Sequence, residues 1–489
     1  MREEIKRGDT RLAVKAGAWY VVSSFLVKGM AFITTPIFTR IMSQADYGEF
    51  SNFASWMATL LIIASAELYN TISRAYYDYT DDFDSYVSTV TIASCIITAI
   101  LYVLTLVFKN WVLNIIALPE KYIHILYITL LCQCCKQSFM ARERTLYRYK
   151  SVAMISMLYL IIPTLIAVLL VVMLPEDQRL SGRIYGFYLP ASVIGLICGA
   201  VILRKARSFR MDQCRYAFKL SMPLLAHYLT AYVLTSSNTI VTKKMLGAAS
   251  SAIVSVASST IHILTVLFQA VSGAVTTWLM DNLKQENHNK IRKDSLFYVA
   301  GLATVSIGVI LLAPEVVWIL GDSRYVESIT LIPNQVLAVL IQSVTSIFTI
   351  ILTYDKNITK TAVYTGVVAV LSVAAKVLLL PILGIQVLPY INVVAFGCLF
   401  VINYILVRKA GYGKAVNFKM MVLILLSVAV FATLSNFLYK YDAIRYGLIF
   451  VLGIAAMVLA YKYRKKIMKV LKSRKKKKSS SAGDAAAQQ

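Results

Sequence analysis

The feature that most constrains the fold of this chain is a series of apolar runs, each close to the roughly 20 residues that a helix needs to cross a bilayer. In lipid, every backbone polar group must be satisfied internally, which an α-helix achieves within one segment. The 489-residue sequence contains fourteen such runs. They lie near residues 17–38, 50–73, 87–108, 122–141, 152–174, 184–203, 221–242, 249–278, 295–320, 329–353, 361–383, 388–407, 419–438 and 444–461. The sequence therefore predicts an all-α polytopic membrane protein with 14 transmembrane helices.

Charge decides how these runs are oriented. Hydrophobic residues make up 58% of the chain, above the roughly 45–50% of soluble proteins, and the net charge is +26. A strongly basic soluble chain suggests nucleic-acid binding, but here the cations lie between apolar runs, and Lys and Arg are retained on the cytoplasmic side. With the N-terminus inside, 38 of the 50 Lys and Arg lie in inner segments, ten in outer loops and two within runs. We expect both termini in the cytoplasm and no nucleic-acid partner.

Three charged residues within the runs stand out, namely Lys28, Glu67 and Lys376. A charge at mid-bilayer costs a few kcal/mol, so such a residue usually faces a cavity, a partner or a substrate. We expect one of three arrangements for Lys28. It forms a buried ion pair with Glu67, or it lines a central cavity where it attracts an anion, or its side chain extends to the membrane surface. The first two arrangements can alternate. Lys376 extends to the outer headgroups or provides a second anion contact.

Uncharged polar residues recur within the later runs. His262 and Gln269 are seven residues apart, and so are Gln335 and Gln342, which places the members of each pair on one helix face. These side chains either line a lumen or form hydrogen bonds between helices. The group comprises His227, Asn238, His262, Gln269, Gln335 and Gln342. Three cations at the predicted outer rim, Arg40, Lys243 and Lys244, either meet lipid headgroups or close an outer gate.

The chain also contains an internal repeat. "PIFTRIMSQADYGEFSNFAS" (36–55) aligns without a gap over "TIVTKKMLGAASSAIVSVAS" (239–258), with six identical positions. Six runs separate the copies, and an even number preserves orientation. This predicts two parallel six-helix lobes related by a pseudo-two-fold axis along the membrane normal, plus two extra C-terminal helices. The expected divisions are 1–215 (N-lobe), 216–410 (C-lobe), 411–461 (last two spans) and 462–489 (basic tail).

The same two segments resemble the signatures of a known family. "TTPIFTRIMSQADYGEFSNF" resembles the opening of polysaccharide exporters, where a threonine/proline stretch and an arginine precede a "D/E-Y-G" turn into the second span. "NTIVTKKMLGAASSAIVSVAS" resembles their second signature, with Leu246-Gly247 matching its "LG". The whole chain is similar to Wzx-type lipid-linked oligosaccharide flippases of the MOP superfamily, whose relatives include the lipid II flippase and MATE exporters. It departs from the family at Asn238-Thr239, where an Asp-Arg pair is common, so no role of that pair is transferred.

The resemblance implies a MATE-like flippase of the bacterial inner membrane, which moves a polyprenyl-pyrophosphate-linked glycan to the outer leaflet by alternating access. The product would be capsule, O-antigen or another exopolysaccharide. The pyrophosphate is then the anion expected at Lys28 and Lys376, and sugars pass the polar lumen. Two alternatives stay open: a cation-coupled multidrug exporter, and a scaffold whose basic tail holds a polymerase and glycosyltransferases. The tail is otherwise expected to rest on anionic lipids.

Motifs of soluble catalytic sites are missing from the sequence. It contains no Walker loop, nucleophile elbow or HExxH string, and its seven cysteines show no paired spacing. We therefore expect no enzymatic activity, no cofactor and no metal. The energy for transport then comes from a Na⁺ or H⁺ gradient, from the substrate gradient or from removal of the product outside.

Overall fold

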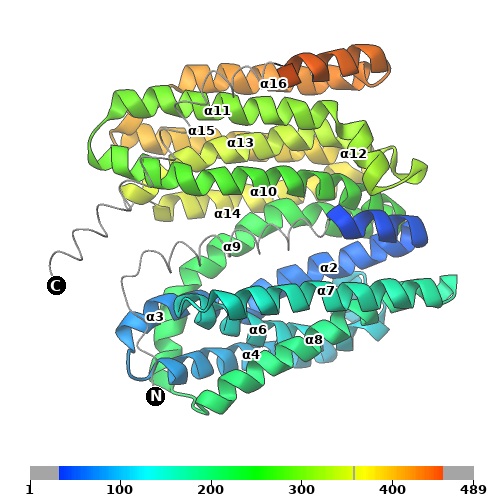
Figure 1. Ribbon diagram of the computed structural model, residues 1–489, viewed down its shortest axis with the longest axis vertical. Helices are drawn as coiled ribbons and strands as arrows, with labels where there is room; N and C mark the ends of the chain where they lie inside the picture. The colour runs from blue at the N-terminus through cyan, green and yellow to red at the C-terminus, as the bar shows by residue number, and fades with distance from the viewer. Residues whose placement is uncertain (1–31, 356–357, 455–489) are drawn as a thin grey trace.

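The computed structural model describes residues 32–355 and 358–454, and these residues form helices without a strand (Figure 1). The predicted all-α fold is confirmed. In chain order, with η marking short 3₁₀ helices, the elements are α2 (Gln44–Ser65), η1 (Leu68–Thr71), α3 (Ile72–Asp78), α4 (Phe83–Val107), α5 (Lys109–Ile116), η2 (Glu120–Tyr122), α6 (Ile123–Thr145), α7 (Tyr149–Met173), η3 (Glu176–Gln178), α8 (Arg179–Lys205), α9 (Met211–Leu246), α10 (Ala248–Lys284), α11 (His288–Leu311), α12 (Ala313–Leu320), η4 (Ser323–Tyr325), α13 (Ser328–Tyr354), α14 (Ile358–Leu383), α15 (Val387–Lys409), η5 (Tyr412–Ala415) and α16 (Phe418–Leu438). Residues 32–41 and 442–454 are helical as well.

The predicted count of fourteen spans is not confirmed. Within residues 32–355 and 358–454, nine helices are long and apolar enough to cross a bilayer, or ten if the pair Lys109–Ile116 and Glu120–Thr145, bent by 92°, forms one span. Two predicted spans fall on α2 and α9, which are not among the nine because polar residues dilute their apolar faces. Much of the first and last predicted spans lies outside the described residues.

The helices form two groups that α9 connects (Figure 1). We call residues 32–205 the first half and residues 248–438 the second half. In the first half α8 packs against α6 and α7, and in the second half α13 packs against α10 and α15. Helix α2 packs against both α9 and α10, so it lies where the halves meet.

The order of elements repeats along the chain. Short helix α5 is followed by η2, which begins at Glu120, and short helix α12 is followed by η4, which begins at Ser323. Each short helix follows one long apolar helix and precedes another. Glu120 and Ser323 are separated by the same offset as Pro36 and Thr239, the first residues of the two aligned segments. The order of elements thus matches the sequence repeat, while the exact lobe boundaries stay a prediction.

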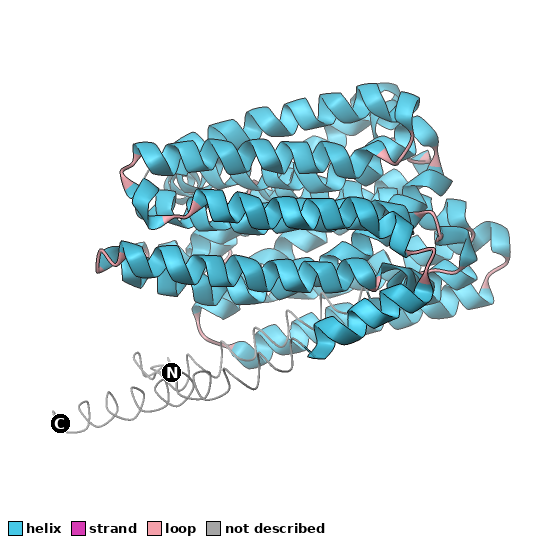
Figure 2. Ribbon diagram, turned by 90° about the horizontal axis from the view of Figure 1, so that it is seen from above, coloured by secondary structure: helices cyan, strands magenta, loops and turns pink. Residues whose placement is uncertain are grey.

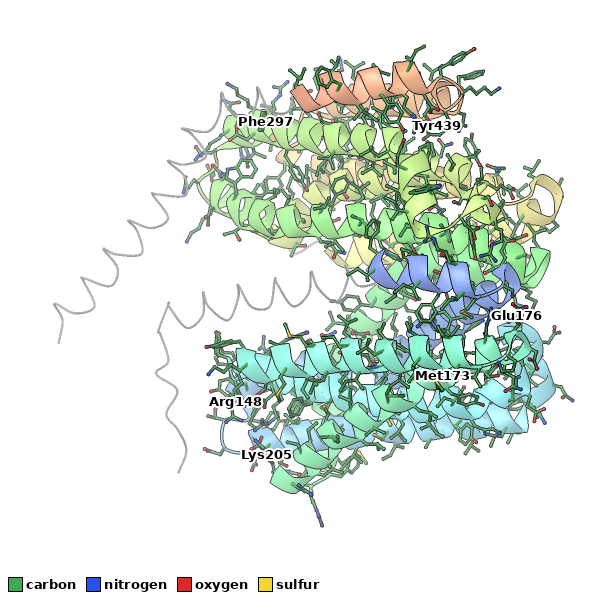
Figure 3. The ribbon with its side chains drawn as sticks, turned by 45° about the vertical axis from the view of Figure 1, so that its right-hand side comes forward. Arg148, Met173, Glu176, Lys205, Phe297 and Tyr439 are labelled. Atoms are coloured by element: carbon green, nitrogen blue, oxygen red, sulfur yellow. The ribbon has the colours of Figure 1, made fainter. Side chains whose placement is uncertain are left out.

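The helices run roughly side by side, and their connections gather at two ends (Figure 2). Figure 3 shows Arg148 and Lys205 at one end of the first half and Met173 and Glu176 at the other. We name these the Arg148 end and the Glu176 end. The junction between residues 32–41 and α2 lies at the Glu176 end, where Arg179 Nη1 donates to the Ile41 carbonyl at 2.7 Å.

The apolar run predicted as one span at 50–73 is broken. Helix α2 ends at Ser65, and Ala66 and Glu67 have positive φ angles of 43° and 54°. At this break the Glu67 N–H donates to a side chain, Ser65 Oγ, at 3.2 Å instead of to a helical backbone carbonyl. Positive φ is unfavourable for residues with a side chain, so surrounding packing must hold this break.

Candidate functional site

Hydrogen bonds join the two halves at the Glu176 end. Among the described residues, all six hydrogen bonds between the first and second halves link residues 39–44 to residues 318–324. Arg40 donates to the carbonyls of Ile319 at 2.9 Å and Trp318 at 3.0 Å. We call residues 39–49, 243–248 and 318–325 together the closed end.

Arg324 bonds in the opposite direction across this contact. Its guanidinium donates to the carbonyls of Thr39 at 2.6 Å and Met42 at 3.2 Å. Asp322 holds the same guanidinium in place, accepting from Nη2 at 2.7 Å. These bonds from Arg324 lower the pKa of Asp322 below its usual value, so both groups are charged near neutral pH.

The "D-Y-G" signature lies in the closed end, and its residues have separate structural roles. The Asp46 N–H donates to Ser43 Oγ at 3.0 Å, which caps the start of α2. The Tyr47 ring lies edge-on to the Tyr325 ring of the second half, with 6.2 Å between centroids. Glu49, which directly follows the signature, forms a salt bridge with Lys243 at the end of α9.

Gly48 lies where α2 crosses the start of α10. A Cβ at this position would lie 1.8 Å from the carbonyl oxygen and 2.6 Å from the carbonyl carbon of Ala248. These are backbone atoms that cannot rotate away, so a larger residue requires the two helices to separate. The glycine of the signature is thus required by close packing between helices of the two halves.

The predicted rim cations divide between two environments. Arg40 and Lys243 have the contacts described above within the closed end, whereas Lys244 is exposed. The roles predicted for the three cations, at lipid headgroups or in an outer gate, stay predictions. The contacts of Tyr47, Glu49 and Arg324 could not be predicted from the sequence, because their partners lie far away along the chain and no local pattern marks them.

Lys376 is fully buried between α14 and α9. Its Nζ donates to the Leu234 carbonyl at 3.0 Å and to Ser237 Oγ at 2.9 Å. Both acceptors are neutral, and among the described residues no carboxylate forms a salt bridge with Lys376. The side chain therefore does not extend to the headgroups in this structure. Its amino group is held by neutral hydrogen-bond acceptors, which an anion can replace.

The other predicted residues do not form one cluster. Asn238 and Gln335 are buried, and Asn238 Oδ1 and Gln335 Nε2 have no hydrogen-bond partner among the described residues. Gln342 is half-buried, and His262 and Gln269 are exposed. Glu67 is buried and accepts from Asn70 Nδ2 at 2.5 Å. Lys28 and the side chain of His227 lie outside the described residues. Their predicted roles stay predictions.

Arg183 is a buried cation that the sequence analysis assigned to an outer loop. Only 6% of it is exposed, and its guanidinium carbon lies 3.3 Å from the centroid of the Phe38 ring and 4.3 Å from that of Phe50. Its Nε and Nη1 have no hydrogen-bond partner among the described residues. Because α8 begins at Arg179, this residue lies one turn inside the helix. The apolar run starting at 184 concealed it.

The closed end offers a direct test through Arg324. We expect Arg324→Ala to remove two hydrogen bonds between the halves, each about 0.7 kcal/mol at a partly exposed site, and so to raise the fraction opened at this end about tenfold. Met42, only 1% exposed, reports that opening when replaced by cysteine in a chain whose seven native cysteines are replaced. Its labelling by a maleimide should accelerate about tenfold in the Arg324→Ala variant. Lys440→Ala, at an exposed position, should leave the rate unchanged; equal rates in all three proteins would contradict the role of Arg324.

Comparisons with known proteins identify the family. The model of the family described as "Polysaccharide biosynthesis protein" matches residues 13–279, more than half of the chain, and this range includes both signature segments. The structure is similar to that of "Lipid II flippase MurJ, inward closed conformation", with a TM-score of 0.64 and 13% sequence identity over 91% of this chain and 99% of that one. It is also similar to an inward-facing multidrug resistance MATE family transporter of the MOP superfamily, with a TM-score of 0.60 and 13% identity over 81% of this chain and 99% of that one. No curated protein matches the sequence. Membership confirms the resemblance inferred from the two signatures, and this chain belongs to the polysaccharide biosynthesis protein family, with the fold that flippases and transporters of the MOP superfamily share.

Proposed function

We propose that this protein is a flippase that moves polyprenyl-pyrophosphate-linked oligosaccharides from the inner to the outer leaflet of the cytoplasmic membrane. A hydrated glycan cannot cross hydrocarbon unaided, because its hydroxyl groups would lose their hydrogen bonds to water. The two halves instead provide a path for the glycan between them. They separate at one end at a time, while the lipid tail stays in the bilayer.

The observation that carries this proposal is the confinement of the hydrogen bonds between the halves, among the described residues, to the closed end. A protein that alternates between two openings needs contacts at one end that can be exchanged for contacts at the other. Basic residues lie in the last turns of α6 and α8, which end near Arg148 and at Lys205 respectively, and they include Arg142, Arg144, Arg204 and Lys205. By the positive-inside rule we assign the Arg148 end to the cytoplasm and the closed end to the outside.

Buried cations supply the recognition of the diphosphate. Lys376 and Arg183 have neutral or aromatic partners rather than carboxylates, so neither charge is cancelled within its own site. In a low-dielectric interior, such charges attract a diphosphate strongly. We propose that Lys376, Arg183 and Lys28 contact the pyrophosphate at successive stages of transport, and that the polar side chains on α9, α10 and α13 contact the sugars. Coupling to a Na⁺ or H⁺ gradient is part of the same proposal.

The test is a flipping assay with purified protein in liposomes. A fluorescent polyprenyl-diphosphate oligosaccharide is distributed over both leaflets, and a membrane-impermeant reagent quenches the label in the outer leaflet. The protein should raise the quenched fraction from the half that one leaflet holds toward all of it. Lys28→Ala should slow this exchange at least tenfold, because it removes the cation that the sequence places within the first apolar run. Lys360→Ala, at an exposed position on α14, is the matched control.

The outcomes separate the three functions. A multidrug exporter moves ethidium and leaves the lipid-linked glycan unflipped, and a scaffold moves neither. Either result with correctly inserted protein would overturn the proposed function. A flippase exchanges the labelled lipid and leaves ethidium where it was added.

A further inference from the structure

A pocket lies at the Arg148 end, between α4, the end of α8 and the linker that leads to α9. Its volume is about 540 Å³. Four apolar and three polar side chains line it. The lining residues are Ile92, Ala200, Leu203, Arg204, Arg207, Ser208 and Phe209. The volume falls in the range of roughly 300–1,000 Å³ that is typical of small-ligand sites.

The two arginines that line the pocket have no partner among the described residues. Two arginines at the same end are paired, since Arg142 bonds to Asp84 and Arg210 to Asp82, each at 2.8 Å. Arg204 and Arg207, in contrast, form no hydrogen bond or salt bridge within the described part of the chain, and both are exposed. Asp82 and Asp84 thus neutralise other arginines and leave Arg204 and Arg207 available.

The apolar residues of the lining show what kind of molecule fits. Ile92 lies nine residues into α4, or about 14 Å along the helix at 1.5 Å per residue. Leu203 and Phe209 remain 36% and 42% exposed. The pocket lining therefore combines two exposed arginines, at the expected headgroup level, with apolar side chains from α4, α8 and the linker. Guanidinium groups bind phosphate with paired hydrogen bonds.

We infer that this pocket binds the headgroup of an anionic glycerophospholipid of the inner leaflet. Arg204 and Arg207 contact the phosphodiester, and the acyl chains run along Ile92, Ala200 and Leu203. Basic pockets between membrane helices at the cytoplasmic side commonly hold anionic lipids. The site is separate from the basic tail at 462–489, and it does not depend on which substrate the protein moves.

The experiment is native mass spectrometry of the full-length, delipidated protein with phosphatidylglycerol or phosphatidylcholine added. We expect the first phosphatidylglycerol to bind at least tenfold more tightly than the first phosphatidylcholine. Arg204→Gln with Arg207→Gln should remove that preference. Ala200→Trp should weaken binding of phosphatidylglycerol without changing charge, because the indole fills the pocket.

The control is Arg408→Gln with Lys409→Gln, which removes two exposed charges from the end of α15 at the same end of the molecule. It should keep the preference. An equal loss in this control would show general attraction to basic surfaces and overturn the inference, as would unchanged binding in Ala200→Trp. Arg204→Lys with Arg207→Lys preserves charge and fold, and should retain part of the preference.

Discussion

Replacing Gly48 by valine should abolish transport while the protein still inserts into the membrane. The added side chain would begin 1.8 Å from the carbonyl oxygen of Ala248, and neither the α2 nor the α10 backbone can move away without opening the closed end. Because alternating access requires this end to close, we expect flipping to fall at least a hundredfold in the liposome assay. The helices themselves remain intact, since valine is tolerated in a membrane helix.

Gly301→Val is the matched control for this variant. Gly301 lies in α11, and a Cβ there would have nothing within 4 Å. The same substitution should therefore leave flipping within about twofold of the original protein. If Gly48→Val transported normally, the close packing of α2 on α10 would be irrelevant to function, and the closed end would not be a gate.

Lys376→Met should also stop transport, for an electrostatic reason. The ammonium donates to the Leu234 carbonyl and to Ser237 Oγ, and it is fully buried. Methionine removes the cation and, with it, the desolvation cost of burying a charge. We expect the melting temperature in detergent to stay the same or rise, while flipping of the diphosphate-linked glycan falls at least tenfold.

Two companion variants interpret that result. Lys376→Glu should fail to yield folded protein, because a buried carboxylate would face the Leu234 carbonyl and Ser237 Oγ without a cation nearby. Lys360→Met, on the exposed start of the same helix, should transport normally. Normal transport by a stable Lys376→Met protein would assign the lysine to packing between α9 and α14 alone.

The architecture was largely predictable because lipid allows few folds. Runs of about 20 apolar residues indicate helices with little ambiguity. The offset between the aligned segments 36–55 and 239–258 recurs in the starts of η2 and η4. Span boundaries were less predictable. Hydropathy reports only where apolar residues cluster, so it missed the break at Ala66 and Glu67, where positive φ angles interrupt an apolar run.

The contacts of the site were much less predictable, since they depend on pairs distant in sequence. The "D-Y-G" signature was recognisable, but the reason for Gly48 lies in the backbone of Ala248, which belongs to the second half. The burial of Arg183 within a helix was not predictable for a different reason. A cation at the edge of an apolar run is normally counted in the loop, and only the start of α8 at Arg179 places it inside the helix.

The most direct test measures distances at both ends of the molecule by double electron–electron resonance. One spin-label pair at Ala45 and Val326 reports the closed end, and another at Arg148 and Lys284 reports the opposite end. Without substrate, the account predicts a narrow, short distance for the first pair. Adding the polyprenyl-diphosphate oligosaccharide should produce a longer population at Ala45/Val326 together with a shorter one at Arg148/Lys284. Distances that stay unchanged at both ends, or that lengthen at both together, would contradict alternating access.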